Sequence, residues 1–222
     1  RNLDNGELLL NLALPYNVTL PGNAPLAPNG VLSRSTSFQL PDGQRGTGRI
    51  QVQVIADQNA SGQGSFAEYT AAGAAADNNN ASSLEFTAQA RSYANLAVTS
   101  ISAPLVGRGG EPITVEWTVR NDGGTAADGG WLDRIVLSTD AVIGNADDLV
   151  LGELERGEAL EALGQYSASL SVMLPLQLNG GVYIAVVADA TQQLLEPDTR
   201  ADNLSALREL SLTAPRADLR VE

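Results

Sequence analysis

Strict alternation of apolar and polar residues constrains the fold of this chain more than any other feature of its sequence. Residues 113–119 read Ile-Thr-Val-Glu-Trp-Thr-Val, with every odd position apolar and every even position polar. A period of two is typical of a β-strand that buries one face. Residues 49–54 follow the same pattern. Because Trp117 falls on the apolar side of the alternation, we expect it in a core between sheets.

Seven strand-forming stretches follow residue 95, and turn-forming residues separate them. Asn-Asp-Gly-Gly at 121–124, Asp-Gly-Gly at 128–130 and Asn-Gly-Gly at 179–181 are strong turn signals. The expected strands cover residues 96–101, 113–119, 131–138, 149–153, 166–173, 181–188 and 206–213. This density of short strands predicts an all-β fold built from immunoglobulin-like sandwiches.

The chain also repeats itself at the scale of a domain. In each copy a strand ends in Leu-Pro, at 40–41 and at 174–175, and a turn containing glycine follows. The next apolar strand ends in Ala-Asp, at 56–57 and at 188–189. Internal repeats of this length indicate tandem modules, so neighbouring repeats of the same chain are the first partners to expect.

The repeat sets the expected module boundaries. The first module covers residues 1–92, the second covers 93–214, and 215–222 begin a third. The first copy has no clear counterpart of the 113–119 strand or of Trp131, so we expect it to be incomplete at its N-terminal side. An incomplete sandwich exposes an apolar sheet face and an open edge, here including some of Ile50, Val52 and Val54.

Composition removes most kinds of catalytic site. The 222 residues include 13 basic and 26 acidic side chains, for a net charge of −13, and no Lys, His or Cys. Nucleophile–histidine pairs need His, zinc sites with N or S ligands need His or Cys, and Schiff bases need Lys. We therefore expect no enzyme activity. The acidic balance disfavours a nucleic-acid partner, and no apolar run is long enough for direct membrane insertion.

The acidic loop at 140–148 is the strongest candidate for a ligand site. It places four oxygen-bearing side chains around one glycine: Asp140, Asn145, Asp147 and Asp148. Calcium takes roughly six to eight oxygen ligands, and the hard oxygen donors available here favour it over zinc or copper. The alternative is a solvated hairpin whose Asp and Asn side chains cap turns.

Other polar and aromatic groups have weaker claims. A second acidic cluster follows the strand that ends at Asp189. We favour a structural interpretation over a metal site, namely a long hairpin whose polar side chains cap turns. Its further members are Glu196, Asp198, Asp202 and Asn203. Trp117 with Trp131 would suit sugar stacking, and Glu153 with Glu155 would suit a glycosidase. Periodicity favours a core role for Trp117, and nothing distinguishes the two glutamates from a charged loop.

An ordered set of motifs in the second copy resembles the CARDB family, the cell-adhesion-related domain found in bacteria. The matching segments are Asn-Leu-Ala-Val-Thr-Ser-Ile (95–101), Val-Glu-Trp-Thr-Val-Arg-Asn-Asp-Gly (115–123), Trp-Leu-Asp-Arg-Ile-Val-Leu-Ser-Thr-Asp (131–140), Asp-Leu-Val-Leu-Gly (148–152), Met-Leu-Pro (173–175) and Gly-Val-Tyr-Ile-Ala-Val-Val-Ala (181–188). The first copy is similar to the same family through Leu-Pro-Asp-Gly at 40–43.

The resemblance implies a fold, a location and a class of function. It implies tandem immunoglobulin-like repeats of a large bacterial protein that is secreted or displayed on the cell surface. We expect a non-catalytic structural or adhesion module, with cell-surface or matrix polymers as further partners. The alternative is a carbohydrate- or polymer-binding accessory module of a secreted enzyme. No cofactor is expected other than the candidate calcium.

Overall fold

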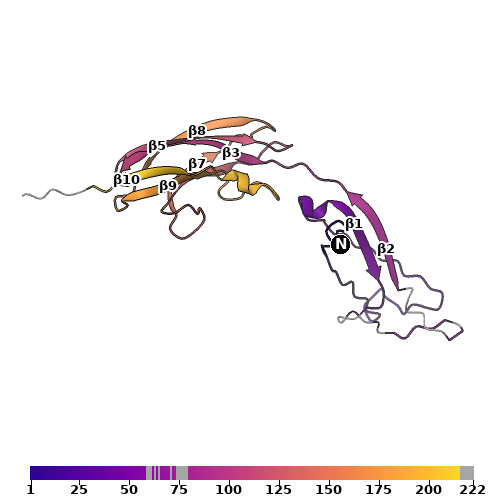
Figure 1. Ribbon diagram of the computed structural model, residues 1–222. Coiled ribbons are helices and arrows are strands. Elements are labelled where there is room, and N and C mark those ends of the chain that lie inside the picture. Colours follow the sequence, from indigo (N-terminus) through magenta and orange to yellow (C-terminus); the bar gives the residue numbers. More distant parts are fainter. Residues whose placement is uncertain (59–61, 63, 65, 71, 74–79, 216–222) are drawn as a thin grey trace, which may run out of the picture. The chain divides into compact units, whose positions relative to one another are not determined.

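The alternating segments form β-strands in the computed structural model, which describes residues 1–58, 62, 64, 66–70, 72–73 and 80–215 (Figure 1). The chain divides into two compact units, unit 1 at Arg1–Arg91 and unit 2 at Ser92–Glu222. Residues 216–222, which carry most of the expected third repeat at 215–222, lie outside the described residues. No helix in the described part of the chain is both long and apolar enough to cross a membrane.

Unit 2 is a β-sandwich, so the all-β fold class predicted from the sequence is confirmed. Its larger sheet has the strand order β4-β10-β9-β6-β7, and its smaller sheet has the order β3-β5-β8. The strands are β3 (Leu96–Ser102), β4 (Val106–Arg108), β5 (Pro112–Asn121), β6 (Trp131–Ser138), β7 (Leu149–Arg156), β8 (Gln165–Met173), β9 (Gly180–Val187) and β10 (Arg208–Thr213). A short 3-10 helix, η3 (Arg200–Asn203), lies between β9 and β10.

The core of unit 2 lies between the two sheets, and the alternation of the strands determines which residues enter it. On β5, Ile113, Val115, Trp117 and Val119 are buried, as predicted. The facing residues come from β6, β9 and β10: Ile135, Leu137, Val182, Ile184, Val186, Leu210 and Leu212. Two inner faces that interdigitate in this way remove a continuous apolar surface from water.

All seven expected strands agree with the observed bounds to within about three residues, which is the usual scatter at strand ends. The largest deviation is at the end of β7, expected at residue 153 and observed at Arg156. Strand β4 was not predicted. It spans three residues and pairs in parallel with β10, so it is too short to display an alternating pattern.

Unit 1 contains a β-hairpin of β1 (Gly48–Ile55) and β2 (Ala81–Ala88), with the short 3-10 helix η1 (Gln44–Gly46) ahead of β1. Residues 1–3 pair with the outer edge of β1 for a short distance, since Asn2 bridges to Ile50. Ile50 is buried, Val52 is half-buried and Val54 is 65% exposed. The described residues of unit 1 therefore include a sheet face that stays largely uncovered.

Candidate functional site

The predicted ligand loop, residues 140–148, connects β6 to β7 and is folded around its own acidic side chains. The Asp140 carboxylate accepts hydrogen bonds from the Val142 backbone N–H at 2.7 Å and from Asn145 Nδ2 at 3.2 Å. Asp147 Oδ2 accepts from the Thr139 N–H at 2.8 Å and from Ser138 Oγ at 3.1 Å. The loop thus satisfies much of its acceptor capacity internally.

The electrostatics of this loop follow from those contacts. Hydrogen bonds from the Thr139 hydroxyl and the Thr139 backbone N–H lower the pKa of Asp147 below its ordinary value. Asp148 Oδ2 accepts from the Gly144 N–H, while its Oδ1 is shielded and has no protein partner. Among the described residues no group of three or more His, Cys, Asp or Glu side chains is arranged to hold a metal ion. Calcium at Asp140, Asn145, Asp147 and Asp148 stays a prediction.

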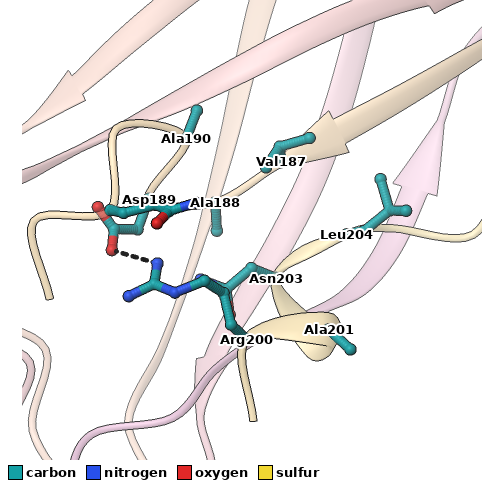
Figure 2. Close-up of a pocket in the computed structure, with 9 residues that line it drawn as sticks. Val187, Ala188, Asp189, Ala190, Arg200, Ala201, Asn203 and Leu204 are labelled. Atoms are coloured by element: carbon teal, nitrogen blue, oxygen red, sulfur yellow. Dashed lines mark hydrogen bonds and ion pairs between the residues drawn. The ribbon is translucent and has the colours of Figure 1, made fainter. Parts of the chain in front are cut away.

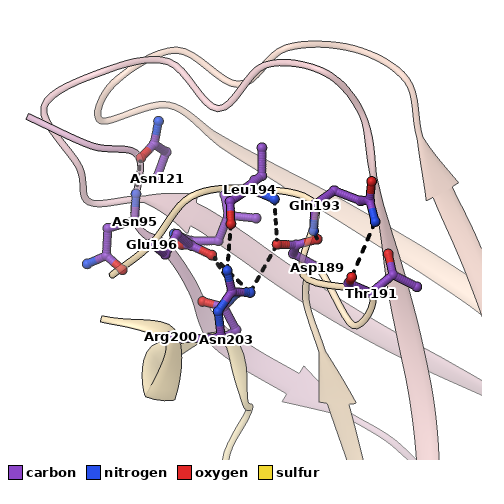
Figure 3. Close-up of polar contacts among 10 residues, drawn as sticks. Asn95, Asn121, Asp189, Thr191, Gln193, Leu194, Glu196, Arg200 and Asn203 are labelled. Carbon is purple, nitrogen blue, oxygen red and sulfur yellow. Dashed lines mark hydrogen bonds and ion pairs between the residues drawn. The ribbon is translucent and has the colours of Figure 1, made fainter. Parts of the chain in front are cut away.

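The second acidic cluster lies in the connection between β9 and β10, where its side chains contact one another (Figure 3). We call Asp189, Glu196, Arg200 and Asn203 the Glu196 cluster. The backbone turns sharply at Asp189, just beyond the end of β9, where φ is +45°. Its carboxylate accepts from the N–H groups of Gln193 at 2.7 Å and Leu194 at 3.0 Å. Asp189 therefore caps the turn that begins the long connection between β9 and β10.

Glu196 joins this connection to the first strand of the unit. Its side chain is fully buried, and Oε1 accepts from the Leu96 backbone N–H at 2.5 Å. Oε2 accepts from Asn203 Nδ2 at 2.8 Å. The bond to Leu96 spans 100 positions of sequence and links β3 of the smaller sheet to the segment that follows β9 of the larger one.

Arg200 supplies the positive charge between the two buried carboxylates (Figure 3). Its Nη1 lies 3.2 Å from Asp189 Oδ2 and 3.9 Å from Glu196 Oε2, and Nη2 donates to the Leu194 carbonyl at 2.5 Å. One guanidinium therefore faces both buried carboxyl groups. The Leu96 N–H and Asn203 Nδ2 supply further donors to Glu196.

A hollow of about 320 Å³ lies beside Arg200 and the turn after β9 (Figure 2). Its lining is mostly aliphatic or backbone, from Val187, Ala188, Ala190, Ala201 and Leu204, with Asp189, Gln192, Arg200 and Asn203 as polar members. The Asp189–Arg200 ion pair borders the hollow and is already satisfied internally. This leaves little unpaired polar functionality to recognise a small molecule.

Asn121 organises the neighbouring contacts at the start of β3. It is fully buried at the end of β5. Its Oδ1 accepts from the N–H groups of Asn95 and Gly123, both at 3.0 Å. Its Nδ2 donates to the carbonyl groups of Thr125 at 2.8 Å and Leu160 at 3.0 Å. One side chain therefore joins the start of β3 to two loops.

A third polar group, Asp133, is buried between the sheets. Asp133 Oδ2 on β6 accepts from Trp117 Nε1 of β5 at 2.8 Å and from the Tyr166 hydroxyl of β8 at 2.5 Å. Burial raises the pKa of Asp133 above its ordinary value, and the hydrogen bonds from Tyr166 and Trp117 oppose that shift. Burial and the nearby Asp133 charge raise the pKa of Tyr166. The group connects the two sheets through polar contacts.

The two tryptophans lie in the core, as periodicity predicted for Trp117. Trp117 and Trp131 each retain only 2% of their accessible surface, so neither indole forms a sugar-stacking platform. Trp131 Nε1 instead donates to the Tyr166 hydroxyl at 3.3 Å. Glu153 forms an exposed ion pair with Arg134 at 2.7 Å.

Sequence reasoning singled out Asp189, Glu196 and Asn203 but missed Asp133, Arg200 and the central role of Asn121. Asp133 did carry a signal, because it occupies an inward position of the alternating strand 131–138. An acidic residue at such a position needs buried donors. No comparable signal marked Arg200, whose partners depend on how the connection after β9 folds.

The outer face of the smaller sheet carries a further hollow, of about 480 Å³. Hydroxyl groups and one carboxylate dominate its rim: Ser100, Ser102, Glu116, Thr118, Ser167 and Ser169. The Thr118 and Ser167 hydroxyls lie 2.9 Å apart and share a hydrogen bond. This hollow suits contacts with a polyhydroxylated chain better than the hollow beside Arg200 does, because its hydrogen-bond donors and acceptors point outward from neighbouring strands.

Among known proteins, the chain shows similarity to solved structures but not to a family model or a curated protein. The chain is similar to the crystal structure of a CARDB domain from Pyrococcus furiosus in complex with di-metal ions, at 16% identity, with 55% of this chain and 90% of that chain covered and a TM-score of 0.41. The solution structure of a CARDB domain from the same organism gives 18% identity, 56% and 100% coverage and a TM-score of 0.41.

A β-glucosidase from Listeria innocua in complex with isofagomine is also similar. The identity is 16% and the TM-score is 0.37, and the match covers 56% of this chain but only 17% of the glucosidase. Identities and TM-scores at these levels do not assign the chain to a family.

Proposed function

We propose that this chain is a non-catalytic structural module of a secreted or surface-displayed bacterial repeat protein with a role in adhesion. The observation that carries the proposal is that the buried Glu196 side chain forms structural hydrogen bonds. Its carboxylate joins the first strand of unit 2 to the connection between β9 and β10 through two hydrogen bonds, to the Leu96 N–H and to Asn203 Nδ2. A module in an array transmits force through its ends, and this contact lies directly at one of them.

The other buried polar groups have the same kind of role. Asp133 joins β6 of one sheet to β5 and β8 of the other. Asn121 joins β3 to two loops. Hydrogen bonds to a buried charge are stronger than neutral ones, and buried polar networks that join separate strands rigidify the packing between them. These buried polar groups thus support a mechanically stable sandwich.

The internal repeat and the resemblance of residues 93–214 to CARDB support the rest of the proposal. The partners are neighbouring repeats of the same chain and polymers of the cell surface or matrix. The location is extracellular or on the bacterial surface.

Single-molecule force spectroscopy tests the structural role. The full chain is tethered by both ends, and unit 2 is expected to unfold in one event whose force falls in the Glu196→Ala variant. Glu209→Ala, which removes an exposed carboxylate from β10, is the matched control and should leave the force unchanged. Equal unfolding forces for the two variants would contradict the proposal. So would turnover of a polysaccharide or ester that disappears in Glu153→Gln.

A second candidate, recognition of a carbohydrate or other polymer, is favoured by the hydroxyl-rich hollow on the smaller sheet. Neighbouring strands present hydroxyl groups at a regular spacing that matches an extended, polyhydroxylated ligand. Affinity electrophoresis in gels with soluble polysaccharides tests this. Retardation of the chain that is lost in Ser167→Arg but kept in the β10 control Glu209→Ala would establish it. Unchanged mobility in every gel would remove it.

A further inference from the structure

The uncovered face and outer edge of the hairpin in unit 1 are a docking site for one additional β-strand, as we infer from the covered counterpart in unit 2. The two copies align where each strand ends in Ala-Asp, so that β1 corresponds to β9. In this alignment Val54 corresponds to Val186. Val54 is 65% exposed, whereas Val186 is fully buried. Among the described residues of unit 1, nothing therefore covers this side-chain position as the second sheet covers it in unit 2.

The neighbouring strand shows the same difference. Phe86 lies opposite Ile50 across the hairpin, as Leu210 lies opposite Val182 in unit 2. Phe86 is 40% exposed and Leu210 is 1% exposed. With Leu84, also exposed, these residues form a contiguous apolar face on β1 and β2. Apolar sheet faces of this kind mark interaction surfaces.

The edge of β1 indicates how an additional strand would enter. The Arg49 carbonyl accepts from the Leu3 N–H at 2.7 Å, and the Gln51 N–H donates to the Arg1 carbonyl at 2.9 Å. Odd-numbered residues of β1 therefore face the edge that residues 1–3 begin to pair. The N–H groups of Gln53 and Ile55 face the same edge, and neither has a partner in the described part of the chain.

Unit 2 shows what occupies the equivalent edge. There β6 pairs antiparallel with β9, and its Leu137 and Ile135 lie opposite Ile184 and Val186. Both β6 residues are buried. In unit 1 residues 1–3 run in the same antiparallel sense as β6, and Arg1 lies at the position that Ser138 has in β6. The docking strand continues a pairing that has already begun.

The occupant we commit to is a strand of the β6 type, with apolar residues opposite Val52 and Val54. Main-chain hydrogen bonds along an open edge supply affinity, and alternate side chains supply register and specificity. Polar residues opposite Val52 and Val54 would fail to cover the face. This requirement distinguishes the site from an edge that pairs with any extended peptide.

A second segment of unit 1 fits the same arrangement. Every even-numbered residue from 8 to 20 is apolar, yet the structure assigns no strand there and leaves these side chains exposed: Leu8, Leu10, Leu12, Leu14, Tyr16, Val18 and Leu20. In unit 2 the segment that follows β6 forms β7 and pairs with the other edge of β6. A docked strand would offer its second edge to residues 8–14 in the same way.

Hydrogen exchange on an extended chain tests the inference. The sequence Trp-Leu-Asp-Arg-Ile-Val-Leu is placed directly before Arg1 of the full chain, so that its last Leu and its Ile face Val52 and Val54. Exchange at the amides of Gln53 and Ile55 should slow by roughly tenfold or more, as expected when unpaired edge amides become hydrogen-bonded. The amide of Ala185 in unit 2 is the internal reference and should not change.

Three variants define the result. An extension with Asp in place of the Ile and the last Leu should give no slowing. Val54→Asp in the extended chain should abolish the slowing, whereas Gln53→Asp, on the opposite face, should keep it at Ile55. Unchanged exchange with the apolar extension, or equal slowing by the Asp-bearing one, would overturn the inference. Slow exchange in the unextended chain that disappears on dilution would instead assign the face to a second copy, and would also overturn it.

Discussion

Removing the Glu196 carboxylate is the most informative single perturbation of unit 2. Glu196→Ala leaves two buried donors without their acceptor, the Leu96 backbone N–H and Asn203 Nδ2. An unsatisfied buried donor costs about 1–3 kcal/mol. Water that enters the space left by the carboxylate recovers part of this loss, so we expect a destabilisation of about 2–4 kcal/mol. Arg200 keeps Asp189 as its partner, so no lone charge is left buried.

Equilibrium denaturation followed by tryptophan fluorescence measures this cost in unit 2 alone. The chain has two tryptophans, Trp117 and Trp131, and both are buried in unit 2. The free energy of unfolding from the denaturant midpoint and slope gives the difference between variants. Glu209→Ala is the control, since an exposed substitution of this kind changes stability by about 0.5 kcal/mol or less.

A graded variant sharpens the comparison. Glu196→Gln keeps one oxygen for the Leu96 N–H but turns an N–H donor toward Asn203 Nδ2 or forces that amide to rotate. We expect it to cost about half as much as the alanine variant, roughly 1–2 kcal/mol. A Glu196→Ala variant as stable as Glu209→Ala would refute the assignment of a structural role to this carboxylate.

Three further predictions concern other parts of unit 2. Trp117→Ala removes a buried ring and a donor to Asp133, and should lower the free energy of unfolding by about 3–5 kcal/mol; an unchanged midpoint would contradict the placement of Trp117 in the core. Burial raises the pKa of Asp133 in the folded state, so its contribution to stability is complete below its ordinary pKa and is lost as pH rises through the raised value. Asp133→Asn should therefore flatten that part of the curve of unfolding free energy against pH, and parallel curves for the two proteins would contradict a raised pKa at Asp133. If calcium binds the 140–148 loop, it should raise the Tm relative to EDTA, and Asp140→Ala should abolish the rise; identical Tm values in calcium and EDTA would remove the site.

Much of the sandwich could be predicted from local pattern because strand periodicity is a local property. The alternation at 113–119 correctly placed Trp117 in the core, and turn residues located the connections between strands. Short β4 escaped prediction, since three residues carry no period and its parallel pairing with β10 depends on contacts far along the chain. The site was less predictable, because Glu196 meets the Leu96 N–H across 100 positions of sequence.

The sequence by itself determined the strand pattern, the internal repeat and the absence of Lys, His and Cys, because these depend only on residue order and identity. The tertiary structure alone decided which carboxylates are buried and what they bind. Asp133 and Glu196 are acidic residues like many others in this chain until the two sheets pack and bring the Trp117, Tyr166 and Leu96 donors to them. The same holds for Val54 and Val186, whose strands have similar patterns but opposite exposure, because burial depends on what packs against a strand as well as on its own residues.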